Sequence, residues 1–209
     1  MNRSGMSRIL VLGLLLCNFF TCLGQRGNYS ALVAKDLKRV SMKSGMIEYK
    51  LSGDVKGTEV LYFDQWGWRE KTIRKYTYSK YGISSDENRV ELRNGDFTFR
   101  GNFKTGKGSA TQNKLESSML RYKSRAEVTQ TIMESRNGTF VGEENILGKL
   151  CTVWEFPRGL TQKIWVHEGL ILKQEQRIAT LTIISTATNI QFDSSYSDGD
   201  FMVEEIVWQ

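Results

Sequence analysis

Cys151 and His167 are the residues best suited to catalysis, because a thiol and an imidazole within hydrogen-bond reach can act as nucleophile and base. His167 is the only histidine in the chain, so a pair of this kind has one candidate base. Two short segments, 149–156 and 161–167, carry these residues, and both are rich in β-branched and aromatic side chains. That composition predicts the two strands of a β-hairpin. Whether the thiol meets the imidazole therefore depends on the register of the hairpin.

The turn limits that register. Either residues 157–160 form a four-residue connection or residues 158–159 form a two-residue one, and both choices place Phe156 opposite Thr161 and Cys151 opposite Val166. One face then carries Cys151, Val153, Ile164 and Val166, and the other carries Leu150, Trp154, Phe156, Trp165 and His167. We therefore expect no thiol–imidazole pair, because such a pair would require an odd-length turn. Cys151 is expected instead to be a small buried core residue. Neither face is polar, so both faces of the hairpin must be covered.

Other catalytic and metal-binding patterns are incomplete. One histidine and one cysteine beyond the first 24 residues cannot supply the ligands of a zinc site. Segment 101–108 has the glycines and lysines of a phosphate-binding loop, but Gly108 stands where a serine or threonine would hold magnesium. The carboxylates of Asp64, Glu143 and Glu144 are not paired at a defined distance by any motif. We expect a non-enzymatic protein with no metal and no cofactor.

Apolar ligand binding has better candidates. Trp68, Trp154, Phe156 and Trp165 are large aromatic residues, and three of them lie in the hairpin that is apolar on both faces. Aromatic side chains dominate the lining of small-molecule sites. We predict that these four residues line a ligand-binding cavity. Packing of the tryptophans beneath a helix is the alternative.

The elements that must position these residues are mostly strands. Ile47, Tyr49 and Leu51 alternate with polar residues, which predicts a strand with one buried face. Asn94-Gly95, between Val90 and Leu92 on one side and Phe97 and Phe99 on the other, predicts a tight hairpin. Residues 64–67 predict a tight turn. Further strands are expected at residues 59–64, 68–78, 164–167, 170–176, 178–186 and 189–193.

Two segments have helical spacing instead. Leu115, Met119, Tyr122 and Ala126 predict a helix from Asn113, as its N-cap, to Ser135, and a shorter helix is expected over residues 30–40. The fold class that follows is mainly β (α+β). We expect a single domain with a curved antiparallel sheet, or open half-barrel, of eight or more strands covered by one or two helices.

Residues 1–24 have the order of an export signal. Arg3 and Arg8 precede an apolar stretch, residues 9–20, and Cys22-Leu23-Gly24 supplies the small residues that a signal peptidase reads. We expect cleavage before Gln25, which leaves residues 25–209 as one domain. The stretch is shorter than the roughly 20 residues that a membrane-spanning helix needs. The sequence therefore predicts an exported, periplasmic protein without a membrane span; lipid anchoring or an extracellular location is the alternative.

Charge and cysteine content narrow the choice of partners. The 29 basic and 23 acidic residues give a net charge of +6, and this mild excess describes a solvated surface. An exported protein rarely meets nucleic acid, so we expect no nucleic-acid partner. Without residues 1–24, Cys151 is the only cysteine, and stability must come from a hydrophobic core rather than from a disulfide.

Three segments carry a resemblance to known proteins. Residues 57–67 (GTEVLYFDQWG), 146–151 (ILGKLC) and 163–169 (KIWVHEG), with Leu172-Lys173 behind the last, resemble a group of uncharacterised exported bacterial proteins. Those proteins are similar in strand order to the LolA/LolB-type periplasmic lipoprotein carriers, whose antiparallel half-barrel is closed by helices over an apolar cavity. The resemblance spans roughly residues 44–205 but departs at 113–135 and 201–204. It rests on turns and core aromatics, so it implies fold more than function.

Two functions follow from these observations. The first is an exported binding protein that shelters an apolar ligand, acyl or lipid-like, in a half-barrel cavity. The alternative is a structural or protein-interaction module of the cell envelope, without a small ligand. A pocket in the size range of ligand sites favours the first, and side chains that fill the same space favour the second.

Overall fold

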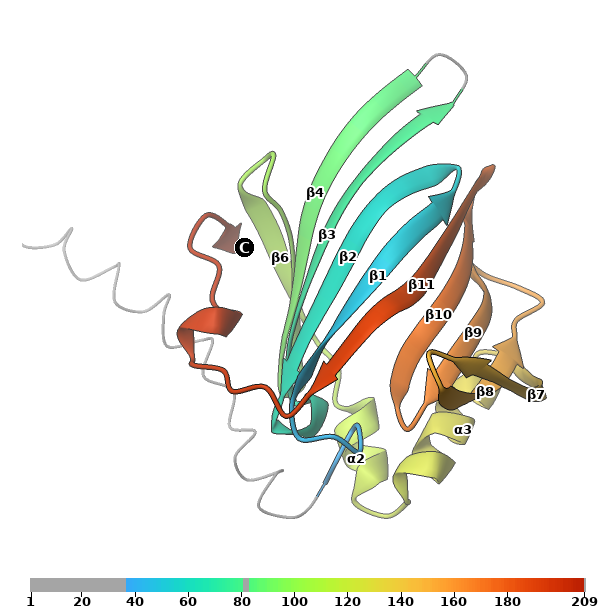
Figure 1. Ribbon diagram of the computed structural model, residues 1–209. Helices are drawn as coiled ribbons and strands as arrows, with labels where there is room; N and C mark the ends of the chain where they lie inside the picture. Colours follow the sequence, from blue (N-terminus) through green and yellow to red (C-terminus); the bar gives the residue numbers. More distant parts are fainter. Residues whose placement is uncertain (1–36, 81–82, 209) are drawn as a thin grey trace, which may run out of the picture.

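The computed structural model describes residues 37–80 and 83–208. Within them, one curved sheet of twelve strands forms most of the molecule, and two short helices lie at one end of it (Figure 1). The strands are β1 (Gly45–Gly53), β2 (Val55–Asp64), β3 (Arg69–Lys80), β4 (Ile83–Asn94), β5 (Phe97–Asn102), β6 (Lys107–Gln112), β7 (Thr139–Ile146), β8 (Lys149–Glu155), β9 (Thr161–His167), β10 (Leu170–Ile178), β11 (Leu181–Phe192) and β12 (Val207–Trp208). Their order is β12-β6-β5-β4-β3-β2-β1-β11-β10-β9-β8-β7, an open arrangement. The expected fold class is confirmed.

Two antiparallel meanders build this sheet. β1 to β6 are neighbours in sequence and in space, and so are β7 to β11. Helices α2 (Leu115–Leu120) and α3 (Arg125–Ser135) connect β6 to β7. β1 pairs with β11 along its whole length, from Gly45 opposite Phe192 to Gly53 opposite Ile183. This single ladder joins the two meanders.

The central core lies on the concave face, where side chains from both meanders meet. It contains Ile47 and Phe63 from β1 and β2, and Cys151, Trp165 and Leu172 from β8, β9 and β10, all at most 2% exposed. β2 and β8 stand far apart in the strand order, yet residues of both belong to this one cluster, which requires the sheet to curl toward this face. Each fully buried side chain of this size contributes roughly 1.5 to 3 kcal/mol to stability.

The C-terminal segment covers the convex face of β4 and β5. Val203 and Ile206 pack against Val90, Leu92 and Phe99. The segment runs through a short 3-10 helix, η3 (Gly199–Phe201), and ends in β12, which pairs parallel to β6. Figure 1 shows it, in red, beside β6.

Two glycines make room for this segment. Gly101 and Gly108 lie opposite each other in the β5–β6 hairpin. A Cβ at Gly108 would lie 2.5 Å from ring carbons of Trp208, and one at Gly101 would lie 3.0 Å from Ile206. The glycine-rich segment 101–108 is therefore a hairpin that accepts the C-terminal segment, and its two flanks are strands rather than the loop expected from the sequence.

The helical segment differs from the expectation of one helix over residues 113–135. α2 ends at Leu120, and α3 begins only after Ser124, which has an extended backbone (φ −63°, ψ 159°). Ser124 and Glu127 form a capping box, in which each side chain accepts a hydrogen bond from the other's backbone N–H. The spacing of apolar residues continues through this break, and the cap was the sequence signal that we missed. No described helix is long and apolar enough to cross a membrane.

The N-terminal expectation lies partly outside the described residues. Of the helix predicted over residues 30–40, the structure describes only residues 37–40, which are not helical. Instead, the backbone N–H groups of Arg39 and Val40 both donate to the carbonyl of Trp66. The signal peptide predicted over residues 1–24 also lies outside the described part.

Two turns explain how the strands connect. The turn predicted over residues 64–67 is present as the short 3-10 helix η2 (Gln65–Gly67). The hairpin predicted around Asn94-Gly95 is confirmed, but its two central residues are Gly95 and Asp96, because Asn94 pairs with Phe97. Only the first central position needs a positive φ, and Gly95 supplies it with a φ of 63°.

The predicted register of the β8–β9 hairpin is wrong by one residue. Thr152 lies opposite Val166 and Val153 opposite Trp165, and the N–H of Phe156 donates to Gln162. The connection is therefore five residues long, an odd number that we did not expect. A one-residue shift moves every side chain of one strand to the other face. Trp165 thus shares the central-core face with Cys151 and Val153.

The prediction that both faces of this hairpin are covered is confirmed. On the face away from the central core, Trp154, Phe156, Ile164 and Val166 pack against Met133 of α3. The two apolar faces therefore belong to two separate clusters on either side of the sheet.

Gly108→Ala should destabilise the protein, because the added methyl group collides with the Trp208 ring. We expect a loss of about 1 to 3 kcal/mol in the free energy of unfolding, measured by urea denaturation. In a Trp208→Ala background the same substitution should cost less, since the ring is gone and only the 2.9 Å approach of the new Cβ to the carbonyl oxygen of Arg100 remains. Equal costs in both backgrounds would show that Gly108 does not seat the C-terminal segment.

Candidate functional site

Polar side chains, most of them charged, occupy alternate positions of β3 to β6 on the concave face beside the central core. Antiparallel register arranges them in rows that cross the strands. One row is Tyr49, Glu59, Arg74, Arg89, Asn102 and Lys107, and the next is Ile47, Leu61, Thr72, Glu91, Arg100 and Ser109. Each row starts with an aromatic or apolar residue in β1 and becomes polar toward β6. The concave face is therefore amphipathic across the sheet.

Apart from the fully buried Ile47, the residues of these rows line a cavity of about 770 Å³, which we call the concave cavity. Ile171 and Gln174 from β10 and Ser185 from β11 complete its lining. Tyr49, Leu61 and Ile171 are apolar or aromatic members of this lining. A volume of this size falls within the roughly 300 to 1,000 Å³ of small-molecule sites.

Acid–base pairs neutralise most of the charge in the cavity. Arg74 pairs with Glu59, which lies directly opposite across β2 and β3. Arg100 donates to Glu91 across β4 and β5 at 2.7 Å. The lining holds four basic residues, Arg74, Arg89, Arg100 and Lys107, against three acidic ones, Glu59, Glu70 and Glu91. The cavity is therefore weakly basic.

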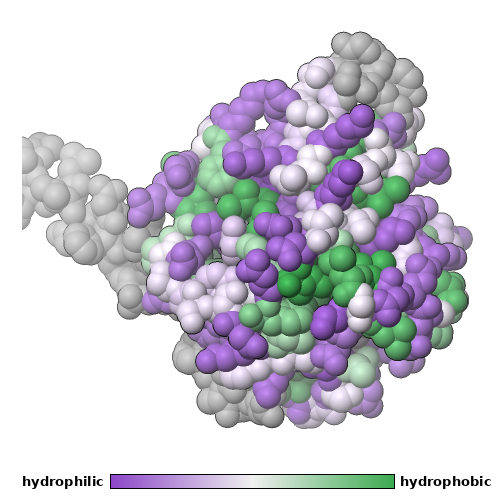
Figure 2. Space-filling view, in the orientation of Figure 1, coloured by the Kyte–Doolittle hydropathy of each residue, from purple (hydrophilic) through white to green (hydrophobic). Residues whose placement is uncertain are grey.

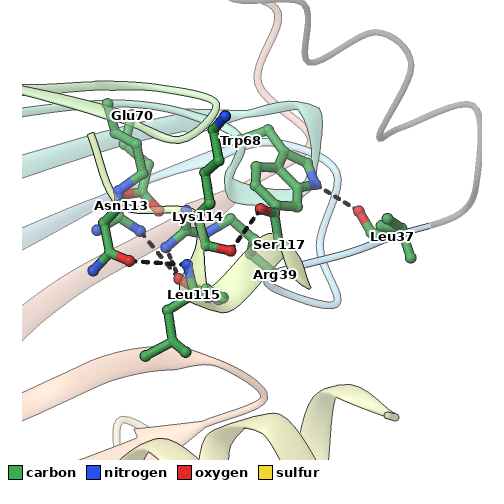
Figure 3. Close-up of polar contacts among 10 residues, drawn as sticks. Leu37, Arg39, Trp68, Glu70, Asn113, Lys114, Leu115 and Ser117 are labelled. Atoms are coloured by element: carbon green, nitrogen blue, oxygen red, sulfur yellow. Dashed lines mark hydrogen bonds and ion pairs between the residues drawn. The ribbon is translucent and has the colours of Figure 1, made fainter. Parts of the chain in front are cut away.

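Glu70 connects the cavity to α2 through a cluster of four charged residues (Figure 3). Arg93 approaches Glu70 at 3.4 Å and Glu116 of α2 at 3.8 Å, and Arg39 pairs with Glu116. Burial raises the pKa of Glu70 to about 7; Arg39 opposes this shift, and the charges of Glu116 and Glu91 add to it. Glu70 thus changes its protonation state near neutral pH, at the point where α2 is held to the sheet.

Two hydroxyl groups in the cavity lining, those of Tyr49 and Ser185, differ in their hydrogen bonding. The Tyr49 hydroxyl donates to the carbonyl of Ile171 at 2.9 Å, and burial, followed by the charges of Glu59 and Glu70, raises its pKa. Ser185 is 8% exposed, and within the described part of the chain its hydroxyl has no hydrogen-bond partner. A buried polar group of this kind costs about 1 to 3 kcal/mol unless something satisfies it.

The four residues predicted to line a ligand cavity lie in three separate clusters. Trp165 belongs to the central core, Trp154 and Phe156 pack with Met133, and Trp68 packs with Leu120 and Val128. The indole N–H groups have protein partners: Trp165 donates to Glu144 at 2.7 Å, and Trp68 donates to the carbonyl of Leu37 at 2.5 Å. The structure does not bring these four residues together around one cavity.

Sequence reasoning missed the residues that do line the cavity. The signal was present, because Glu59, Arg74, Arg89, Glu91 and Arg100 all occupy alternate positions of predicted strands. We expected charged side chains such as Arg74 and Arg100 to form a solvated surface, since charged residues normally face outward. The convex face of β4 and β5 instead carries the apolar residues and is buried by the C-terminal segment.

The odd-length connection removes the register argument against a thiol–imidazole pair, but Cys151 and His167 have separate partners. The Cys151 thiol is fully buried in the central core, donates to the carbonyl of Lys149, and has its pKa raised by burial. The Nδ1 atom of His167 lies 2.8 Å from the carbonyl oxygen of Leu150. Within residues 37–80 and 83–208, no group of three or more His, Cys, Asp or Glu side chains could hold a metal ion.

The chain matches no protein-family profile and no curated protein sequence. Among solved structures, an uncharacterized conserved protein from Thermus thermophilus is similar with a TM-score of 0.50 and 5% identity, over 87% of this chain and 100% of that one. LprF from Mycobacterium bovis has a TM-score of 0.34 and 9% identity, over 79% of this chain and 93% of LprF. The first likeness concerns the fold alone, and the second is too weak to carry an argument. The relation to the LolA/LolB-type carriers stays a prediction.

Trp165→Ala should behave as a core truncation. Removing a fully packed indole should cost about 3 to 5 kcal/mol in the free energy of unfolding. Trp165→Phe keeps most of the packing and should cost less, although it leaves Glu144 without its indole donor. A Trp165→Ala protein as stable as the wild type would contradict the core role and make Trp165 a candidate ligand contact again.

Glu70→Gln should stabilise the protein at high pH but not at low pH. The unfolded carboxyl ionises near its ordinary value of 4.5, whereas the folded one stays protonated up to about pH 7. The wild type therefore loses stability as pH rises between these values, and the variant does not. With the side chain 22% exposed, we expect a relative gain of about 1 to 3 kcal/mol at pH 8 and none at pH 4. Urea denaturation across this pH range measures the difference in the free energy of unfolding. Glu204→Gln, at an exposed position of the C-terminal segment, is the matched control.

Proposed function

We propose that this chain is an exported, non-catalytic binding protein that holds an amphipathic, anionic ligand in its concave cavity. The observation that carries the proposal is the lining of that cavity. It has ligand-site volume, apolar surface at Tyr49, Leu61 and Ile171, and an excess of basic over acidic residues. Export rests on the signal expected in residues 1–24.

The lining argues against a purely apolar ligand. An acyl chain spread along β3 to β5 would desolvate charged side chains without replacing their hydrogen bonds, at a cost of several kcal/mol. A ligand with an acidic head group avoids that cost, because Arg89 and Arg100 are more than half exposed and their ion pairs, with Glu87 and Glu91, are made through Nε, which leaves the outer guanidinium nitrogens to bind it. The lipid-like ligand expected from the sequence is therefore narrowed to one with an anionic head.

Ser185, on the β11 side of the cavity, also supports a ligand with polar atoms. Its buried hydroxyl has no hydrogen-bond partner among the residues that the structure describes, and Ser185 lies opposite Gln174, which also lines the cavity. A polar ligand atom between these two side chains would satisfy the hydroxyl. The cavity thus offers polar contacts on two walls and apolar contacts between them.

Ser185→Ala separates a binding role from a structural one. Removing an unpartnered hydroxyl should leave the thermal midpoint unchanged or raise it, because no protein hydrogen bond is lost. The same substitution should weaken ligand binding about threefold to tenfold, the value of one hydrogen bond. Isothermal titration with lysophosphatidate, which has one acyl chain and one phosphate, measures the affinity.

The charge requirement is tested with a neutral ligand of the same chain length. A monoacylglycerol should bind at least tenfold more weakly than lysophosphatidate. Replacing Arg89 and Arg100 with alanine should abolish that difference without unfolding the protein, since both side chains are exposed. Arg177→Ala, outside the cavity, is the matched control. Equal affinity of the wild type for both lipids, or no binding of either, would refute the proposal.

A further inference from the structure

The free edge of β7 is an exposed surface that the concave cavity does not use. Among residues 37–80 and 83–208, β7 is the last strand of the sheet and pairs only with β8. A bulge at Val141 interrupts the ladder, but Gly142 to Ile146 then pair regularly with Lys149 to Val153. This five-residue run presents an unpaired backbone edge, which is a template for another strand.

The hairpin turn determines which backbone groups point outward. Ile146 pairs with Lys149 across Leu147 and Gly148, whose φ values of 52° and 76° fit a type I′ turn. In a two-residue hairpin the flanking pair is hydrogen-bonded, and alternate residues then direct their N–H and C=O groups away from the partner strand. The outward groups are therefore those of Glu143 and Asn145.

A groove beside this edge carries charge opposite to that of the whole chain. It has a volume of about 990 Å³ and lies between α3 and strands β7 to β9. Its lining contains Glu134, Glu143 and Glu168 but only one arginine, Arg125, in a chain whose net charge is +6. Its apolar surface includes Phe140 and Leu150, which are 51% and 56% exposed. Figure 2 shows the face of the molecule seen in Figure 1, on which hydrophilic residues predominate around a hydrophobic patch.

The two faces of β7 differ in what they would offer to an added strand. Glu143 lies opposite Thr152 and lines the groove. On the other face, Ile146 packs against the central core. An added strand would therefore place basic side chains over the groove and apolar side chains beside Ile146, which is the alternation that a strand provides.

We propose that the β7 edge binds an extended segment of another protein, with alternating basic and apolar residues, by strand addition. A second copy of this chain fits less well. Two β7 strands paired about a two-fold axis at Glu144, the centre of the regular run, would put Glu144 of one chain directly opposite Glu144 of the other, and like charges opposite each other destabilise a sheet. The charge of the edge selects a basic partner instead.

The probe is a labelled heptapeptide of alternating lysine and valine, and fluorescence anisotropy measures its binding. We expect binding that weakens as salt is raised. A peptide of alternating glutamate and valine should not bind. The lysine–valine peptide with methylated backbone nitrogens at alternate positions keeps its charge but loses the ladder donors, and it should bind about tenfold more weakly. This comparison leaves the protein unaltered.

Two variants locate the site. Asn145→Pro removes an outward N–H at an edge position, where proline is tolerated, and should weaken binding about tenfold. Glu143→Lys should weaken binding of the lysine–valine peptide and create binding of the glutamate–valine peptide, while Glu204→Lys, the same charge change elsewhere, should do neither. Circular dichroism verifies that each variant is folded.

The proposal is overturned if the lysine–valine peptide fails to bind, if the methylated peptide binds equally well, or if both edge variants bind like the wild type. Self-association in sedimentation that Asn145→Pro abolishes would also overturn it, because the occupant would then be a second copy.

Discussion

The ladder between β1 and β11 is the interaction on which the rest of the structure depends. It joins two meanders that are each built from local hairpins, and the residues that it pairs are at least 130 positions apart in the sequence. Without it, the apolar faces of β1 and β2 would have no opposite wall in β8 to β10, and the central core would not exist. Pairings of such sequence separation are costly in chain entropy, so they form only when the core that they create compensates for that cost.

Curling around the central core divides the concave face into two regions. Toward β11 and β1 the face is apolar and packed, and toward β6 it is charged and open. The convex face of β4 and β5 shows the reverse, since its apolar residues are buried by the C-terminal segment. The cavity is polar because the charged faces of these strands, and not their apolar faces, are the concave ones. From the fold class we had expected an apolar cavity.

The concave cavity and the β7 edge are chemically different surfaces on one sheet. The cavity has a small basic excess, whereas the groove beside β7 is acidic. Their linings share no residue, so a ligand in the cavity and a strand on the edge would not compete for the same side chains. The binding-protein and interaction-module hypotheses drawn from the sequence can thus describe two regions of the same molecule.

The sequence by itself determined the fold class, the alternation of the strands and several turns, because period-two patterns and turn residues act within a few residues of one another. It did not determine the register of β8 and β9, where an odd-length connection moved Trp165 to the face of Cys151. It also did not determine which strand face is concave, so the predicted aromatic residues proved to be packed in clusters, while charged residues such as Arg89 and Arg100 line the cavity. A single strand has two faces that its own sequence can distinguish by polarity. Only the curl of the whole sheet, fixed by contacts between distant strands, decides which of those faces encloses space.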